Sequence, residues 1–149
     1  SILVTPKQLQ MGMANVIKNT GLQGRWQQLK EQPKVIADTA HNKNGLEIVM
    51  RQIQKEKFDQ LHLVLGVVND KDLKEVLPLF PKKAIYYFCK PNIPRGLEAT
   101  TLQTEAQVFG LNGEVYSSVS EAYEAALKNA APTDFVYVGG STFVVAEIL

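Results

Sequence analysis

The sequence has few of the residues that cross-link a chain or attract it to nucleic acids and membranes. Cys89 is the one cysteine among 149 residues, which excludes an internal disulfide framework and a cysteine-rich zinc site. The 16 Lys and Arg against 15 Asp and Glu give a net charge of +1, too small to attract nucleic acid or an anionic membrane. No apolar run approaches the length of a membrane span and no signal peptide is visible, so we expect a cytoplasmic protein.

Two phosphate-binding motifs are missing as well. Neither G-x-x-x-x-G-K-[ST] nor G-x-G-x-x-G occurs anywhere in the chain. A phosphate-transferring enzyme built from this chain alone would therefore lack its usual phosphate cradle. Because the chain begins at Ser1 rather than at Met, we consider that it is a processed product or an excised fragment.

Apolar, β-branched segments alternate with amphipathic segments over most of the chain. In a chain with the size and the 45% hydrophobic content of one ordinary domain, this alternation predicts an α/β fold with a mostly parallel sheet of about six strands. The strand cores are continuously apolar, which is typical of strands covered by helices on both faces. The expected strands are 24–29, 35–38, 61–67, 84–88, 114–117 and 135–138. The expected helices span 42–55, 101–109, 120–130 and 141–149, with one more starting near residue 70 and another, 5–21, outside the alternation.

Polar clusters follow four of the expected strands, at residues 38–42, 66–72, 90–95 and 139–142. In open α/β sheets, ligands bind beyond the carboxyl ends of the strands. Because the carboxyl ends of parallel strands meet at one edge of the sheet, these clusters should converge there. We therefore expect a binding site at that edge.

Asp38, His41 and Asn42 bring a carboxylate, an imidazole and an amide into one strand-to-helix loop. The carboxylate can accept hydrogen bonds from a ribose or orient a cation, and the imidazole can exchange protons near pH 7. In the alternative interpretation, Asp38 and Asn42 only cap the following helix. The residues by themselves leave the two interpretations evenly balanced.

The segment 139–141 (Gly-Gly-Ser) and Arg25 are further candidates, each with a simpler interpretation. Glycines before a helix expose backbone N–H groups to an anion, but a tight turn with Ser141 as the N-cap explains them too. Arg25 can reach a phosphate with its fork of donors, but an exposed surface arginine is the simpler explanation. The residues alone favour the simpler interpretation in both cases. We also expect His62 to be a core histidine and Cys89 a buried, small apolar residue.

Five short motifs follow one another along the chain: 24–27 (GRWQ), 38–42 (DTAHN), 70–72 (DKD), 94–95 (PR) and 139–141 (GGS). Taken in order, they resemble the C-terminal domain of the folylpolyglutamate synthase/dihydrofolate synthase family, which belongs to the Mur ligase superfamily. Each motif alone is weak, but the ordered set is specific and spans nearly the whole chain.

The resemblance implies a Rossmann-like sheet and an activity that needs more than this chain. It makes residues 24–149 the C-terminal Rossmann-like ligase domain and residues 1–23 the tail of a central ATPase domain or a linker helix. Such enzymes use ATP and magnesium to activate a dihydropteroate or folate carboxylate as an acyl phosphate, which the amino group of L-glutamate then attacks. The P-loop and the magnesium ligands belong to the preceding domain of the same chain, so we expect this fragment alone to be inactive.

The resemblance also implies roles for five residues. Arg25 matches a linker arginine that reaches the ATP phosphates, and Asp38 matches an aspartate that contacts the nucleotide ribose. His41 and Asn42 match the part of the same loop that faces the acyl phosphate and the nucleotide. Ser141 matches a serine near the incoming glutamate. His41 and Ser141 are thus the candidate catalytic residues, the other three are candidate ATP-binding residues, and no metal ligand is assigned.

Three positions depart from the family pattern, and two alternatives stay open. Thr39 stands where the family loop commonly has glycine, Lys43 where it has proline, and the segment 142–143 (Thr-Phe) where a histidine sometimes follows. One alternative is the C-terminal domain of a Mur-type ligase of peptidoglycan precursors. The other is a non-enzymatic, flavodoxin-like receiver or interaction module, which would need an acidic cluster at the strand ends where Asp38 stands nearly alone.

Overall fold

The computed structural model describes residues 25–69 and 72–149. The strands are β2 (Gln27–Glu31), β3 (Lys34–Ala37), β4 (Leu61–Leu65), β5 (Ile85–Phe88), β6 (Gly113–Val115) and β7 (Phe135–Gly139). The helices are α1 (Lys43–Gln54), α2 (Leu73–Val76), α3 (Ala99–Val108), α4 (Val119–Asn129) and α5 (Thr142–Ala146), with a 3-10 turn, η2 (Leu77–Leu79), after α2. The helix expected over 5–21 lies outside the described residues.

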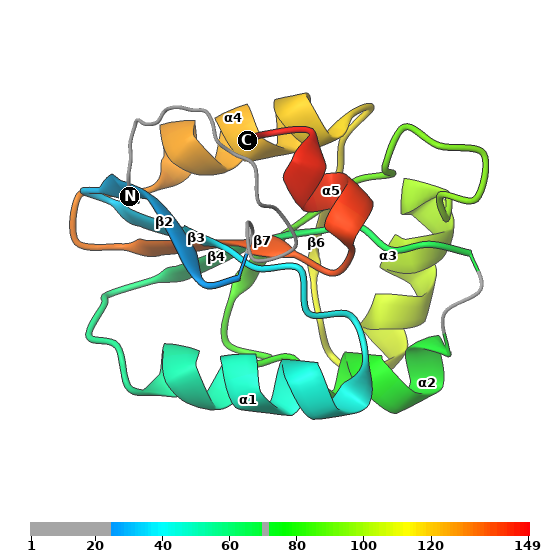
Figure 1. Cartoon of the computed structure of the whole chain (residues 1–149), viewed down its shortest axis with the longest axis horizontal. Coiled ribbons are helices and arrows are strands. Elements are labelled where there is room, and N and C mark those ends of the chain that lie inside the picture. Colours follow the sequence, from blue (N-terminus) through cyan, green and yellow to red (C-terminus); the bar gives the residue numbers. More distant parts are fainter. Residues whose placement is uncertain (1–24, 70–71) are drawn as a thin grey trace.

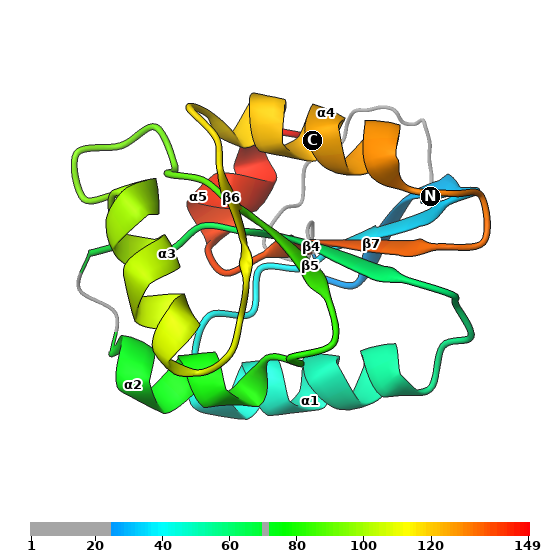
Figure 2. The same cartoon turned by 180° about the vertical axis from the view of Figure 1, so that it is seen from behind.

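The expected α/β architecture is confirmed. The six strands form one sheet in the order β2-β3-β7-β4-β5-β6. Neighbouring strands are parallel except for β2 and β3, which form an antiparallel hairpin at one side of the sheet. Figure 1 shows helices above and below this sheet, and Figure 2 shows the same layers from behind.

The two faces of the sheet are buried under different helices. Helices α1, α2 and α3 pack on one face and α4 and α5 on the other, so each face has its own apolar core. Successive residues of a strand point to opposite faces, and β4 accordingly sends Leu63 to one core and Val64 to the other. This explains why the strand segments are continuously apolar. Cys89 is fully buried, as expected, and burial together with the charge of Glu147 raises the pKa of its thiol to about 12.

The bounds of several elements differ from the sequence-based expectation, among them the end of β4, which is Leu65 rather than residue 67. The first strand begins only at Gln27, because Trp26 has a φ of +43°, which residues of a β-strand do not adopt. The helix expected from residue 70 is short, since α2 gives way to η2 where Pro78 lacks the N–H that would continue an α-helix. The last helix ends at Ala146 rather than at residue 149. In the part of the chain that is described, no helix is long and apolar enough to span a membrane.

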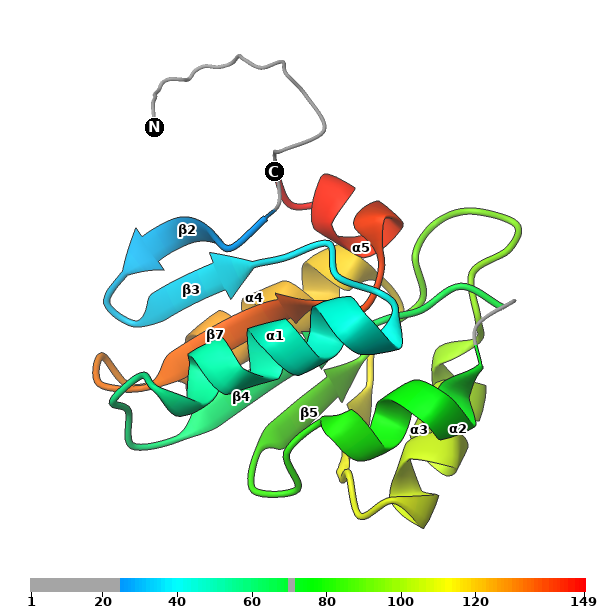
Figure 3. The same ribbon diagram turned by 60° about the horizontal axis from the view of Figure 1, so that its bottom comes forward.

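The parallel strands all end at the same edge of the sheet, where α5 and the start of α1 also lie (Figure 3). At this edge the loops that follow β7 and β4 approach each other closely. Gly140 has a φ of +101°, and a Cβ on it would lie 2.4 Å from the carbonyl oxygen of Gly66. Only glycine fits such a position, so the turn after β7 by itself explains the glycine at residue 140.

His62 lies near the opposite edge and is confirmed as a core histidine. Its ring is 2% exposed, with Nδ1 2.8 Å from the Tyr87 hydroxyl and Nε2 2.8 Å from the Asp134 carboxylate. Asp134 also accepts hydrogen bonds from the backbone N–H groups of Gln60 and Ala131. Burial raises the pKa of the Asp134 carboxyl, but the hydrogen bonds from Ala131 and His62 and the charge of His62 outweigh it and hold this pKa below the ordinary value of 3.8.

This network makes the stability of the fold depend on pH through Asp134. A carboxyl with a lowered pKa in the folded chain contributes stability that is present above its unfolded pKa and is lost as the pH falls through its folded pKa. We expect Asp134→Asn to lower the free energy of unfolding in urea by about 1–3 kcal/mol at pH 7. The difference from the wild type should shrink as the pH falls below 3.8.

The matched control is Asp59→Asn, which changes an exposed carboxyl that accepts a hydrogen bond from the Thr133 hydroxyl. It should change the free energy of unfolding by no more than about 0.5 kcal/mol. A loss for Asp134→Asn that stays constant from neutral to acid pH would contradict the role given to the Asp134 charge.

Candidate functional site

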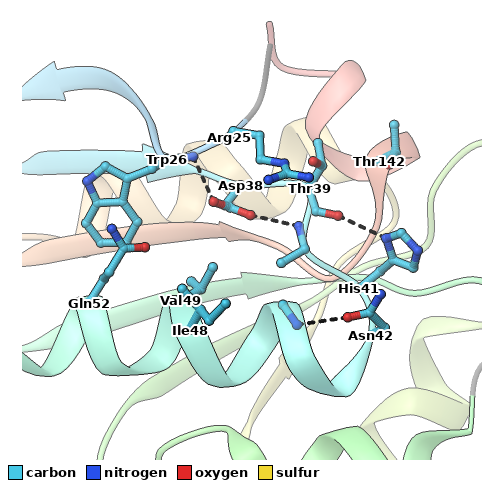
Figure 4. A pocket seen from close by; sticks show the side chains of 12 residues that line it. Arg25, Trp26, Asp38, Thr39, His41, Asn42, Ile48, Val49, Gln52 and Thr142 are labelled. Atoms are coloured by element: carbon cyan, nitrogen blue, oxygen red, sulfur yellow. Dashed lines mark hydrogen bonds between the residues drawn. The ribbon is translucent and has the colours of Figure 1, made fainter. Parts of the chain in front are cut away.

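A cavity of about 270 Å³ opens at the carboxyl edge of the sheet, beside the start of α1. It is lined by four of the five site residues that the sequence predicts: Arg25, Asp38, His41 and Asn42 (Figure 4). The rest of its wall includes Trp26 from the segment before β2, one side of α1 and Thr142 at the start of α5. The fold thus assembles the cavity from segments that are far apart in the sequence.

Asp38 connects two of these segments. Its side chain is 4% exposed, and each of its carboxylate oxygens accepts a backbone hydrogen bond of 2.7 Å, Oδ2 from Trp26 and Oδ1 from Ala40. Its own N–H donates to the carbonyl of Val138 and so extends the pairing of β3 with β7. Asp38 therefore does not cap α1. It joins the segment before β2 to the loop after β3.

Asn42 is the residue that caps α1. Its Oδ1 accepts a hydrogen bond of 2.8 Å from the Gly45 N–H, which confirms the capping interpretation for this residue. The exposed ring of His41 lies next to it, with Nδ1 3.2 Å from the Thr39 carbonyl oxygen. Because a carbonyl oxygen only accepts, this contact requires the proton on Nδ1. In the neutral ring Nε2 is then the nitrogen that accepts a proton.

Arg25 and Trp26 bring the segment before β2 to the cavity. Arg25 is exposed and lines the cavity wall (Figure 4). Trp26 is half-buried, and its indole packs on Phe135 with ring centroids 6.3 Å apart. Its φ of +43° lies in the left-handed region, which a bulky residue rarely adopts. Because Arg25 directly precedes Trp26, this backbone conformation also sets the position from which the Arg25 side chain extends.

Ser141 lies at the same edge but is not part of the cavity wall. It is 3% exposed and caps α5, with Oγ accepting a hydrogen bond of 3.1 Å from the Phe143 N–H. The simpler interpretation of the segment 139–141, a tight turn followed by an N-cap, is therefore confirmed. The next residue, Thr142, does line the cavity. A role of Ser141 toward glutamate stays a prediction.

Sequence reasoning missed the apolar part of the cavity. Trp26 and Ile48 both line it, and Ile48 is 54% exposed on α1. Ile48 could have been found from the sequence, because it lies outside the apolar stripe of the helix that faces the core. An isoleucine on the solvent side of a helix indicates a surface that can bind a ligand. For Trp26 no periodic pattern was available, because its role follows from a single unusual backbone angle.

Two other predicted motifs lie outside this cavity. Arg95 is exposed in the loop after β5, where its carbonyl accepts a hydrogen bond from the Asn69 N–H. Of the segment 70–72, only Asp72 is described. It occupies the N-cap position of α2 but makes no side-chain capping hydrogen bond.

Within residues 25–69 and 72–149, no group of three or more His, Cys, Asp or Glu side chains is placed to hold a metal ion. Asp38 is the one carboxylate among the described residues that line the cavity. The residues of the cavity therefore do not fit a magnesium site, and no step is assigned to magnesium here.

The sequence matches the family described as Mur ligase, glutamate ligase domain, over residues 24–142. It is 36% identical over 135 residues to a probable bifunctional folylpolyglutamate synthase/dihydropteroate synthase of Haloferax volcanii, a match covering 88% of this chain and 16% of that protein. It is 32% identical over 148 residues to the dihydrofolate synthase/folylpolyglutamate synthase of Escherichia coli, covering 98% of this chain and 33% of that protein.

Solved structures agree with these matches. The structure of E. coli FolC in complex with DHPP and ADP superposes with a TM-score of 0.76 at 32% identity, over 84% of this chain and 30% of that one. The chain thus spans about a third or less of the length of the proteins it matches. The family match over most of the chain, together with the matching fold, shows that the chain belongs to the Mur ligase family and matches its glutamate ligase domain.

Proposed function

We propose that this chain is the C-terminal domain of an ATP-dependent ligase that joins L-glutamate to dihydropteroate, folate or both. Residues 24–149 form that domain, and residues 1–23 are the tail of a preceding central ATPase domain or a linker. The observation that carries the proposal is the convergence of Arg25, Asp38 and the His41–Asn42 pair on one cavity. The names of the H. volcanii and E. coli relatives support a folate and glutamate as substrates.

The cavity suits the nucleotide part of ATP. The guanidinium of Arg25 offers a fork of donors to phosphate oxygens. The Asp38 carboxylate has about four lone-pair positions and uses two of them on backbone N–H groups, so it can still accept from ribose hydroxyls. Asn42 uses Oδ1 on the helix cap and keeps its amide N–H groups as donors. Trp26 and Ile48 give the cavity an apolar wall on which a purine ring can pack.

His41 is the proposed proton acceptor of the ligation step. When the amino group of glutamate attacks the acyl phosphate, a C–N bond forms, the C–O bond to phosphate breaks, and the nitrogen must lose a proton. The proton on Nδ1 of His41 leaves Nε2 as the accepting atom. The Ser141 hydroxyl accepts from a backbone N–H and keeps its hydrogen to donate, which suits a contact with the carboxylate of glutamate.

The remaining parts of the reaction are assigned to the rest of the parent protein. The sequence contains no phosphate-binding loop, and the relatives are about three times as long as this chain or longer. We therefore place the P-loop and the magnesium ligands in the preceding domain. Closure of the two domains over the cavity would exclude water from an acyl phosphate that hydrolyses easily.

The folate ligase is favoured over the two alternatives. The relatives reported above carry folate enzyme names, which favours a folate over a peptidoglycan precursor as the acceptor of glutamate. Membership of a ligase family argues against a non-enzymatic receiver module. Assaying the parent protein with dihydropteroate, folate and a UDP-muramoyl peptide distinguishes the two ligases.

The isolated chain should be catalytically silent. Because it has no phosphate cradle, we expect no glutamate-dependent release of phosphate from ATP above the background without enzyme. A phosphate-release assay with dihydropteroate or folate present measures this, and the parent protein at the same concentration is the positive control. Turnover by the isolated chain would show that the missing domain is not required.

In the parent protein, Arg25→Ala should impair the use of ATP. Loss of a cation that stabilises a transferring phosphoryl group should lower kcat/KM for ATP on the order of 100-fold. Steady-state kinetics at varied ATP measures this, with Arg51→Ala as the matched control, since Arg51 is exposed on α1 and lies outside the cavity. Equal kinetics for the two variants would remove Arg25 from the ATP site.

A further inference from the structure

The hydrogen bond between Asp38 and the N–H of Trp26 ties the segment that carries Arg25 to the end of β3. It is 2.7 Å long, joins residues 12 apart, and is charge-assisted because the acceptor is a carboxylate. The carboxylate is almost fully buried, so water competes weakly for it. The β2–β3 pairing ends at Gln27 and Ala37, so beyond that pair this bond helps to hold Trp26 and the preceding Arg25 at the cavity.

Trp26 occupies a conformation that opposes this bond. A φ of +43° is disfavoured for a residue with a bulky side chain, and the cost must be met by its contacts. Those contacts include the hydrogen bond to Asp38 and the packing of the indole on Phe135. If the hydrogen bond opens, the backbone can relax to an ordinary φ, and Arg25 moves with it.

A second donor for Asp38 lies in the core next to it. Among the described residues, the hydroxyl of Tyr137 is the only buried side-chain polar atom that has no hydrogen-bond partner. Tyr137 is opposite Ile36 in the pairing of β3 with β7 and shares its core, and Asp38 follows Ile36 by two residues on the same face.

The ring of Tyr137 extends toward the carboxyl edge of the sheet, where Asp38 lies. It passes over Gly139, since a Cβ on that glycine would lie 2.7 Å from the Tyr137 hydroxyl oxygen. Complete burial, and then the charge of Asp38, raise the pKa of Tyr137 well above its usual value. The hydroxyl therefore keeps its proton and remains a donor.

We propose that Asp38 is a positioning residue with two alternative donors, the backbone N–H of Trp26 and the hydroxyl of Tyr137. In the held state Trp26 donates to Asp38, and Arg25 is fixed at the cavity. In the released state the Tyr137 hydroxyl donates to the same carboxylate, and the N–H of Trp26 turns to water. Each state leaves the Asp38 carboxylate hydrogen-bonded, so neither state buries an unpaired charge. This exchange goes beyond the proposed function, because it requires no particular ligand in the cavity.

Two variants should shift this equilibrium in opposite directions. Asp38→Asn leaves one accepting oxygen for the N–H groups of Trp26 and Ala40, which bond separate oxygens of Asp38, so it weakens the hold on Trp26 and favours release. Tyr137→Phe removes the alternative donor, disfavours release, and leaves no unpaired hydroxyl in the held state. Each shift should change the released population on the order of fivefold, the change that one ordinary hydrogen bond produces.

Two measurements on the whole 149-residue chain without nucleotide report the released state. Trp26 is the only tryptophan of the sequence, so quenching of its fluorescence by acrylamide follows its exposure. An arginine-specific protease cuts the bond between Arg25 and Trp26 at a rate that tracks the released population, and mass spectrometry identifies the fragment that begins at Trp26. We expect faster cleavage and stronger quenching for Asp38→Asn, and slower cleavage and weaker quenching for Tyr137→Phe.

Cleavage after Arg51 in the same samples reports unfolding of the fold itself, because Arg51 lies in α1. The matched control is Tyr86→Phe, which removes a buried hydroxyl that donates to the Pro81 carbonyl away from Asp38. It should leave cleavage after Arg25 unchanged.

Wild-type or faster cleavage after Arg25 in Tyr137→Phe overturns the proposal, and so does unchanged cleavage after Arg25 in a folded Asp38→Asn. If Asp38→Asn accelerates cleavage after Arg51 as well as after Arg25, it has unfolded, and Tyr137→Phe alone decides. None of these outcomes bears on the assignment of the cavity to ATP, which the kinetics of Arg25→Ala test separately.

Discussion

The two hydrogen bonds that the Asp38 carboxylate accepts are the interaction on which the candidate site depends. They join the segment before β2, which carries Arg25, to the loop after β3, which carries His41. The β2–β3 pairing brings the two segments together as far as its last pair, Gln27 with Ala37, but Trp26 and Ala40 lie beyond it and outside any regular element. The buried Asp38 carboxylate continues the contact beyond that pair, because it bonds two backbone N–H groups at a site where water is largely excluded.

The parallel sheet explains why this loop is the place for a ligand. Parallel strands point their carboxyl ends to one edge, and the loops there are free to carry polar residues while the strands below stay apolar. The opposite edge also carries buried polar groups, but those of His62 and Asp134 are fully engaged with one another and with the backbone. Polar residues therefore serve ligand binding at one edge and cohesion of the fold at the other.

The sequence predicted the features that depend on repeated patterns. It did not predict those that depend on a single contact between distant residues. Continuously apolar strands predicted the parallel sheet and its covering helices, and the buried position of His62 followed from its apolar strand. The place of Asp38 and His41 at the carboxyl edge followed from the topology rule for ligand sites, whereas the site role of Arg25 came from the family resemblance. The φ of Trp26 and the paired oxygens of Asp38 depend on contacts between distant residues, so no local pattern encodes them. Capping by Ser141 was foreseen, but its absence from the wall of the cavity was not.

The most direct test of the account is an NMR titration of the 149-residue chain with a non-hydrolysable ATP analogue, mapped on the backbone amides. If the cavity at the carboxyl edge binds the nucleotide, the largest shifts should fall on Trp26, Ala40 and Gly45, whose N–H groups bond the site side chains. Shifts concentrated instead on Gln60 and Ala131, which bond Asp134 at the opposite edge, would contradict the assignment.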